Sequence, residues 1–193
     1  MSLLPEYFYL RDDVTLIAKE LLGKVLLTHI DGEITGGMIT ETEAYAGAID
    51  KASHAYKNRR TKRTDVMFQK GGVAYVYLCY GIHNLLNVVT HQKDTPHAVL
   101  IRSVIPQYGS KWIEKRLGKK TPKVLSGPGV VTKALGITLE HNGVSLQSST
   151  LWIEDRGFAP KEILCSPRIG IGYAEEDAKL PWRFYFIPDT LKR

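Results

Sequence analysis

Hydrophobic and polar residues follow helical spacing near the start of the chain and strand spacing soon after it. Residues 12–23 begin with two aspartates, place apolar side chains at helical intervals and end at Gly23, which predicts a short capped helix. Segments 22–30 and 37–45 have strand character, and the pair Asp31-Gly32 lies between them. An Asp-Gly pair between two such segments predicts a β-hairpin.

A second hairpin is predicted in residues 71–92, which contain no Asp, Glu, Lys or Arg. Their length would suit a membrane span, but tyrosines, histidines, asparagines and two opening glycines interrupt them, so buried β structure is the better interpretation. Apolar arms at 73–78 and 85–90 flank Tyr80-Gly81, as in a long hairpin. Further strands are predicted at 98–104, 151–154 and 183–187.

Two short helices are predicted at 110–117 and 130–135. The Ser-Gly-Pro-Gly run at 126–129 introduces the second helix, either as a simple helix entry or as a phosphate-binding turn, and Gly136 ends it. Asn142-Gly143 marks a later turn. Because no repeat or low-complexity linker divides the chain, residues 1–193 are predicted to form a single domain. The mixture of hairpins and short helices favours an α+β fold with a mostly antiparallel sheet.

Composition excludes several classes of protein. The chain has 193 residues, 44% hydrophobic and 24% charged, which excludes long disorder, collagen-like repeats and a small disulfide scaffold. A net charge of +6 favours a polyanionic partner, and ribosomal or heparin-type binding is compatible with charge alone. Cys79 and Cys165 lie far apart without metal-ligand spacing, so neither a zinc site nor a disulfide framework is indicated. With no secretory pattern in residues 1–10, a cytoplasmic location is expected.

Two carboxylates share one face of the predicted strand 37–45. In an extended chain Glu41, Glu43 and Tyr45 point the same way. The segment is either an edge strand with a solvated acidic face or a strand whose carboxylates have a chemical purpose, such as the paired acids of glycoside hydrolysis. Arg102 lies in a buried-looking strand and needs an anion, for which Glu43 is a candidate.

Basic and aromatic residues supply a second set of candidates. Five of the seven residues from 57 to 63 are basic, among them Arg59, Arg60, Lys62 and Arg63, which form either a solvated loop or a grip on phosphates. Tyr75 and Tyr77 share a strand face and have the spacing of core residues. Tyr80, beside Gly81 at a hairpin tip, is predicted to be exposed, where it could stack on bases or wedge between them. Asn87 in an apolar arm is either bonded to backbone or aimed at a ligand.

These residues together carry a resemblance. The run 41–45 (Glu-Thr-Glu-Ala-Tyr), His54, the hairpin 75–81 with Asn87, the strand 99–102 and the run 126–129 are similar to the alkyladenine (3-methyladenine) DNA glycosylase family, in order, from about residue 21 to residue 186. The resemblance implies a single compact α+β domain with a curved, mostly antiparallel sheet, short flanking helices and a protruding β-hairpin. It also implies that no metal and no cofactor are needed.

The resemblance implies a role for each matching residue. Glu43 corresponds to the base that activates water, and Arg102 to the arginine that holds this water. Tyr45, His54 and Tyr77 correspond to side chains that sandwich the extruded base. Asn87 corresponds to the side chain that crowds a guanine amino group, and Tyr80 to the one that fills the gap in the duplex. Residues 82–84 (Ile-His-Asn) depart from the aromatic or apolar residues that other members carry, which affects the duplex contact rather than the pocket.

The function implied is that of a monofunctional glycosylase. It would flip damaged purines, such as 3-methyladenine, 7-methylguanine, hypoxanthine and ethenoadenine, out of double-stranded DNA and hydrolyse the N-glycosidic bond, starting base excision repair without lyase activity. A monomer without membrane contact or an obligate protein partner is expected, nucleoid-associated in a bacterium. The alternatives are a carbohydrate hydrolase that uses Glu41 and Glu43, and a non-catalytic nucleic-acid-binding module.

Overall fold

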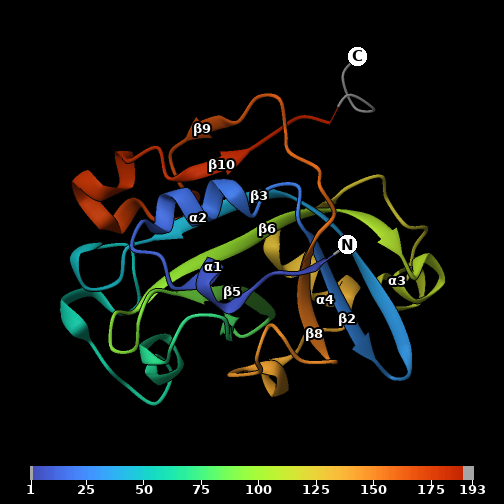
Figure 1. Cartoon of the computed structure of the whole chain (residues 1–193), viewed down its shortest axis with the longest axis horizontal. Coiled ribbons are helices and arrows are strands. Elements are labelled where there is room, and N and C mark those ends of the chain that lie inside the picture. The colour runs from blue at the N-terminus through green and yellow to red at the C-terminus, as the bar shows by residue number, and fades with distance from the viewer. Residues whose placement is uncertain (1, 189–193) are drawn as a thin grey trace.

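A single sheet runs through residues 2–188, the part of the chain that this computed structural model describes (Figure 1). Its main path has the order β1-β8-β2-β3-β6-β5-β4, and β7, β9 and β10 join it at the sides. The strand pairs are antiparallel. The ten strands of this region are β1 (Ser2–Leu3), β2 (Val25–Ile30), β3 (Glu33–Tyr45), β4 (Ala74–Cys79), β5 (His83–Thr90), β6 (His97–Tyr108), β7 (Leu125–Ser126), β8 (Leu151–Asp155), β9 (Leu164–Ser166) and β10 (Arg183–Tyr185).

Short helices flank this sheet. Their bounds are α1 (Glu6–Tyr9), α2 (Val14–Glu20), α3 (Ser110–Leu117) and α4 (Pro128–Leu135), with 3₁₀ turns η1 (Gly47–Ile49), η2 (Tyr56–Asn58), η3 (Asp65–Phe68), η4 (Leu139–His141) and η5 (Gly172–Lys179). The predicted capped helix is confirmed as α2, because the Asp13 side chain accepts bonds from the backbone N–H groups of Thr15 and Leu16. The predicted helix at 110–117 coincides with α3. Gly136 ends α4 with φ +74°, a value that favours glycine.

Strand β3 changes partner along its length. One edge pairs with β6, whereas the other pairs with β2 over Glu33–Met38 and with β10 over residues 41–43. Irregularities in the β3–β6 register lie between Ile39 and Glu41 and between Glu41 and Thr42. The acidic segment is therefore paired on both sides. Its interpretation as an edge strand with a solvated face is wrong, because β10 returns from the end of the chain to cover it.

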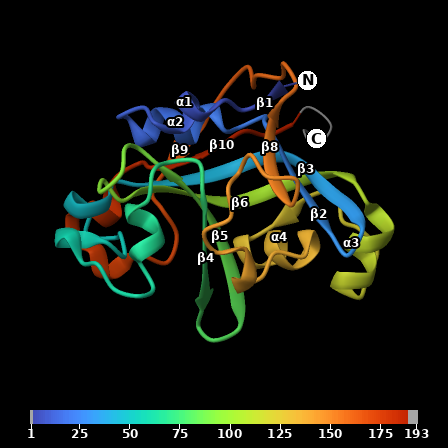
Figure 2. The same cartoon turned by 60° about the horizontal axis from the view of Figure 1, so that its bottom comes forward.

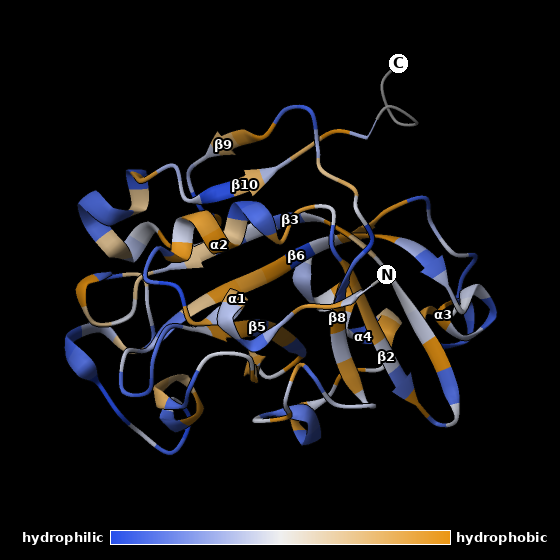
Figure 3. Ribbon diagram, in the orientation of Figure 1, coloured by the Kyte–Doolittle hydropathy of each residue, from blue (hydrophilic) through white to orange (hydrophobic). Residues whose placement is uncertain are grey.

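The helices lie on opposite faces of the sheet. Figure 2 shows α1 and α2 on one side of β3 and β6, and α3 and α4 on the other. On the first side, the Thr42 hydroxyl donates to the carbonyl oxygen of Ala18 in α2, at 2.8 Å. Ile17 of α2 and Ile101 of β6 belong to one buried hydrophobic cluster, and Figure 3 shows hydrophobic positions along both elements. Because α2 covers the face of β3 that carries Thr42, the side chains of Glu41, Glu43 and Tyr45 lie on the opposite face of the strand.

The predicted second hairpin is confirmed. Strands β4 and β5 pair from Ala74↔Val88 to Cys79↔His83, and Figure 2 shows the hairpin projecting from the body of the molecule. At its tip Tyr80 and Gly81 both have positive φ, and Tyr80 is 88% exposed. Tyr80 is therefore not part of the core.

The predicted fold class is confirmed, with differences at the level of elements. β3 and β6 are longer than predicted, β2 begins at Val25 rather than at 22, and β10 ends at Tyr185 rather than at 187. The short elements α1, β1, β7 and β9 were not predicted, since they have too few residues for a periodic pattern. Among residues 2–188, no helix is long and apolar enough to span a bilayer.

Gly37 makes the close approach of β3 to β6 possible. A Cβ atom built on Gly37 would lie 2.0 Å from the carbonyl oxygen of Ile105, which is far inside van der Waals contact. We predict that Gly37→Ala lowers the free energy of unfolding by about 1–3 kcal/mol, as overpacking does. Gly172→Ala is the matched control, because nothing lies within 4 Å of its Cβ. Urea unfolding checks this, and equal midpoints for the two variants would contradict the prediction.

Candidate active site

Strand β3 presents two carboxylates to Arg102 of β6. The guanidinium Nε donates to Glu41 Oε1 at 3.1 Å, and its Nη1 donates to Glu43 Oε2 at 3.3 Å. The Tyr45 hydroxyl donates to the same Glu43 oxygen at 2.8 Å. These contacts confirm that the three β3 side chains share a face, and that Glu43 is an anion for Arg102.

Glu43 is completely buried yet well supplied with donors. Its side chain is 0% exposed, and besides Tyr45 and Arg102 it accepts a bond from the backbone N–H of Ile169 at 2.8 Å. Burial raises the pKa of this carboxyl above its usual range, while Arg102, Ile169 and Tyr45 act in the opposite direction. Among described residues Oε1 receives a single bond, which leaves a lone pair for a further donor such as water.

Glu41 occupies a different environment from Glu43. Its Oε1 contacts two guanidinium groups, that of Arg102 at 3.1 Å and that of Arg183 in β10 at 3.0 Å. Two positive charges therefore lie beside the Glu41 carboxylate. Glu43 contacts Arg102, which it shares with Glu41, and its side chain is more deeply buried. Two acids on one strand face thus have distinct surroundings, which is how proteins assign distinct roles to neighbouring carboxyl groups.

A cavity of about 490 Å³ lies next to Arg102, which contacts both carboxylates. The β4–β5 hairpin, the beginning of β6 and loops from two other parts of the chain enclose it. Predicted residues that line it are Tyr45, His54, Arg63, Tyr77, Tyr80, Asn87 and Arg102, and Ile169 also belongs to the wall. Glu43 lies directly behind the wall, because the three groups that bond it all line the cavity. Asn87 Nδ2 also donates to the Tyr75 carbonyl oxygen at 3.2 Å, so this side chain both bonds to backbone and faces the cavity.

Aromatic rings pack closely on one side of the cavity. The His54 and Tyr77 rings are 4.7 Å apart between centroids, and Tyr75 and Tyr77 stack at 5.4 Å. His54 Nδ1 lies 2.9 Å from the Tyr75 hydroxyl, and the Arg63 guanidinium carbon lies 4.8 Å from the Tyr77 ring centroid. Burial, aided by the charge of Arg63, lowers the pKa of His54 to about 4. The imidazole is therefore neutral at pH 7.

The basic residues of the predicted loop 57–63 differ in whether they form ion pairs. Arg60 pairs with Asp65 at 2.7 Å and with Asp94 at 3.1 Å. Within residues 2–188 the three other candidates for phosphate contact, Arg59, Lys62 and Arg63, form no ion pair. Arg59 and Arg63 line a second cavity of about 400 Å³, which adjoins the first through His54. The charge of Arg60 is thus used internally, and the other three remain available to an anion.

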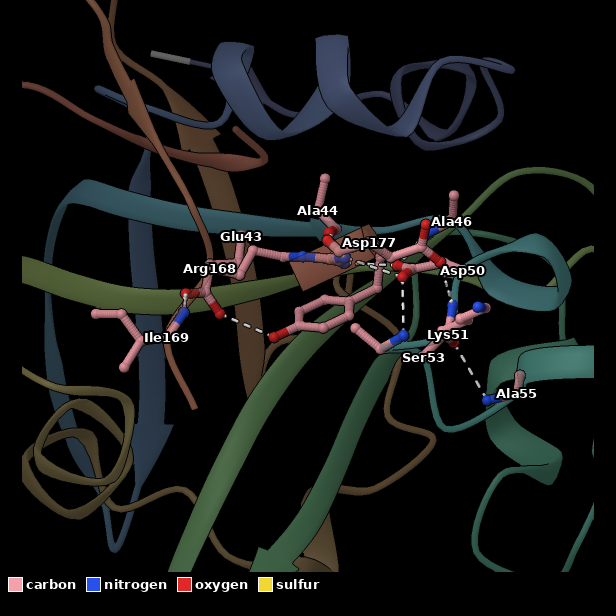
Figure 4. A network of polar contacts seen from close by, with 12 residues as sticks. Glu43, Ala44, Ala46, Asp50, Lys51, Ser53, Ala55, Arg168, Ile169 and Asp177 are labelled. Carbon is pink, nitrogen blue, oxygen red and sulfur yellow. Dashed lines mark hydrogen bonds and ion pairs between the residues drawn. The ribbon is translucent and has the colours of Figure 1, made fainter. Parts of the chain in front are cut away.

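Sequence reasoning missed part of the site. Figure 4 shows that Arg168 pairs with Asp50, and that Ile169 reaches Glu43. These partners are separated by 118 and 126 positions in the chain, and a backbone N–H has no signature in the sequence.

The run 126–129 leads into α4 and packs closely on the β4–β5 hairpin. A Cβ atom built on Gly129 would lie 2.9 Å from His83 Cβ.

The arrangement suits one kind of chemistry. A buried carboxylate with a free lone pair can take a proton from water, and the flat aromatic walls beside it can hold a planar ring. Among residues 2–188, no three His, Cys, Asp or Glu side chains gather in a way that could hold a metal ion.

Comparison with known proteins shows similarity along nearly the whole chain. The family model described as methylpurine-DNA glycosylase (MPG) matches residues 7–189. A protein of Chlamydia abortus named "Putative 3-methyladenine DNA glycosylase" is 51% identical over 185 residues, which cover 94% of this chain and 97% of that protein. A protein of Bacillus mycoides with the same name is 45% identical over 194 residues, which cover 94% of this chain and 95% of that protein.

The electrostatics of His54 can be tested directly. We predict that its imidazole titrates at about pH 4, and that Arg63→Ala raises this pKa without restoring the usual value, because burial is the larger cause. Histidine NMR titrations of the two proteins measure both effects. An ordinary pKa that is the same in both would contradict the packing described around this ring.

Proposed function

This chain is a DNA glycosylase of the methylpurine-DNA glycosylase family, and from this premise we propose how it works. It flips damaged purines out of double-stranded DNA and hydrolyses their N-glycosidic bond with an activated water, which starts base excision repair. The lesions proposed are 3-methyladenine, 7-methylguanine, hypoxanthine and ethenoadenine. The observation that carries the proposal is a buried carboxylate, Glu43, behind an aromatic cavity that can hold one extruded base.

Glu43 acts as the general base. A water bound near its free Oε1 lone pair attacks C1′ of the damaged nucleotide as the N-glycosidic bond breaks. The electron pair of that bond leaves with the base, and the water proton goes to Glu43. Arg102, 3.3 Å from Glu43 Oε2, holds the carboxylate and the water in place. No covalent enzyme–DNA intermediate forms, because water is the nucleophile.

Tyr45, His54 and Tyr77 bind the extruded base. Their faces stack on a flat purine and favour electron-poor cationic rings through cation–π attraction. A neutral His54 supports this role, because an imidazolium would repel a methylated cationic purine. Asn87 lies in the same wall and excludes normal guanine through a clash with its exocyclic amine.

Tyr80 fills the vacated position in the base stack. Extruding a base costs a few kcal/mol, which an inserted aromatic ring offsets by restoring stacking contacts. The 88% exposure of Tyr80 at the tip of a projecting hairpin supports this role, and Ile82 beside it is 73% exposed. The nearby Arg59, Lys62 and Arg63 contact the phosphate backbone.

The two alternatives fit the site less well. A carbohydrate hydrolase that used both acids would need Glu41 free to act, whereas two guanidinium groups hold it. A binding module would have no use for a buried carboxylate behind a cavity. A mobility-shift comparison separates the three, because a hydrolase of glycans binds neither duplex and a simple module binds damaged and normal duplex alike.

The role of Glu43 gives the most specific prediction of this function. On duplexes that each carry one defined lesion, Glu43→Gln should lower single-turnover excision by about 10²-fold to 10⁴-fold, because the amide cannot accept the proton. Binding to the damaged duplex should survive. Glu41→Gln is the matched control, with the same chemical change on the same strand face, and should lose less than about tenfold.

Some results would contradict this mechanism. A folded Glu43→Gln protein that excises at the native rate would exclude Glu43 as the base. Borohydride should trap no adduct with DNA, and a trapped adduct would indicate an amine nucleophile instead. Chelators should leave activity intact.

The charge of the loop gives a further prediction. Arg59→Ala and Lys62→Ala should each weaken binding to every duplex and reduce the slope of log affinity against log salt by about one unit. Arg60→Ala should leave the slope unchanged, because Asp65 and Asp94 already neutralise its charge. Binding isotherms at several salt concentrations measure these slopes. If Arg60→Ala alone changed the slope, the proposed division of the loop would be wrong.

A further inference from the structure

A buried ion pair lies behind the cavity wall. Arg168 Nη1 is 2.5 Å from Asp50 Oδ2 and Nη2 is 2.9 Å from Asp50 Oδ1, a bidentate arrangement, and both side chains are 0% exposed. Figure 4 shows the pair and, next to Arg168 in the chain, Ile169 at Glu43. An ion pair this deep is costly to desolvate unless further hydrogen bonds complete it.

Backbone groups complete the pair almost fully. The Asp50 oxygens accept bonds from the N–H groups of Ala52 at 2.9 Å and Ala46 at 3.1 Å. Arg168 Nη1 donates to the Ala44 carbonyl oxygen at 2.8 Å, and Nη2 donates to that of Asp177 at 3.2 Å. With these partners in place, the guanidinium group has one position and one orientation.

The guanidinium group of Arg168 lies between two aromatic rings. Its central carbon is 4.8 Å from the Tyr45 ring centroid and 5.1 Å from that of Trp182. Tyr45 lines the cavity, whereas Arg168 and Trp182 do not. Arg168 therefore covers the back of the Tyr45 ring and leaves the other face to the cavity.

Arg168 also fixes the group that follows it in the chain. Its peptide bond leads to the N–H of Ile169, which donates to Glu43 Oε1 at 2.8 Å. The Tyr45 hydroxyl donates to Glu43 Oε2 at 2.8 Å. One anchored side chain thus sets two of the three donors that hold the Glu43 carboxylate.

We propose that Arg168, anchored by Asp50, is a positioning residue for base excision, which orients the Tyr45 ring for the extruded base and the Ile169 N–H for Glu43. This inference rests on the proposed role of Glu43 as the base. Loosening Arg168 weakens two bonds to the charged carboxylate, so excision needs a higher pH. The other titratable groups that face Glu43 are Glu41 and Arg102. Both are unchanged in the variants below, as is Arg183, which contacts Glu41.

The test uses Arg168→Lys in the full-length protein. Lysine keeps the positive charge near Asp50 but cannot bind it in a bidentate way or lie flat between two rings. At pH 7, single-turnover excision of 7-methylguanine from duplex DNA should fall about tenfold or more, as expected for misplaced catalytic groups. The acidic limb of the pH–rate profile should move to higher pH by about half a pH unit or more. Damaged-duplex affinity should stay within about threefold.

Arg116→Lys is the matched control. The Arg116 side chain is 13% exposed, and it donates to Thr35 Oγ1 at 3.0 Å and to the Ala134 carbonyl oxygen at 3.2 Å, at the other end of β3. Its variant should keep the native rate and the native pH profile. Circular dichroism and active-site titration correct each rate for the fraction of folded protein.

A second variant covers the case in which Arg168→Lys does not fold. Trp182→Leu removes the outer ring and leaves the ion pair intact, and it should lower excision about threefold with the acidic limb moved in the same direction. The proposal is overturned if the folded variant has the native rate, or a lower rate with the acidic limb in place. Failure of the proposed function is distinguishable, because wild type would then not excise or Glu43→Gln would remain active.

Discussion

Burying an ionised carboxylate costs several kcal/mol unless donors replace the water that it loses. Glu43 meets this condition through an arginine, a phenol and a backbone N–H, and even so burial raises its pKa. The compromise suits a general base, since the carboxyl is more basic than a solvated one. The other features of the site can be understood as ways to supply these donors.

The fold supplies these donors from three segments of the chain, and a fourth segment covers the strand edge beside them. Tyr45 comes from β3 itself, Arg102 from β6, and Ile169 from the loop after β9, while β10 pairs with β3 and brings Arg183 to Glu41. The change of partner from β2 to β10 encloses the acidic part of β3 within the sheet. Without that enclosure Glu43 would be an ordinary solvated acid on an edge strand.

The local parts of this arrangement could be predicted from the sequence. Asp13 and Gly136 marked helix ends, Tyr80-Gly81 marked a hairpin tip, and the period of two placed Glu43 and Tyr45 on one face. The contacts between distant segments could not be predicted from it. The Asp50–Arg168 pair and the closure of β3 by β10 arise from tertiary packing between residues more than a hundred positions apart, where no period or spacing applies. The internal pairing of Arg60 was hidden for a different reason, because a basic run looks the same whether or not carboxylates face it.

The central claim is that Glu43, a buried carboxylate, activates the water by accepting its proton. A ¹³C NMR titration of the free protein, labelled in its glutamate carboxyl carbons, measures this directly, with the Glu43 signal assigned by its absence in Glu43→Gln. The account predicts a titration midpoint above the usual glutamate range that coincides with the acidic limb of single-turnover excision. A midpoint at or below that range, or an acidic limb that follows another group, would contradict it.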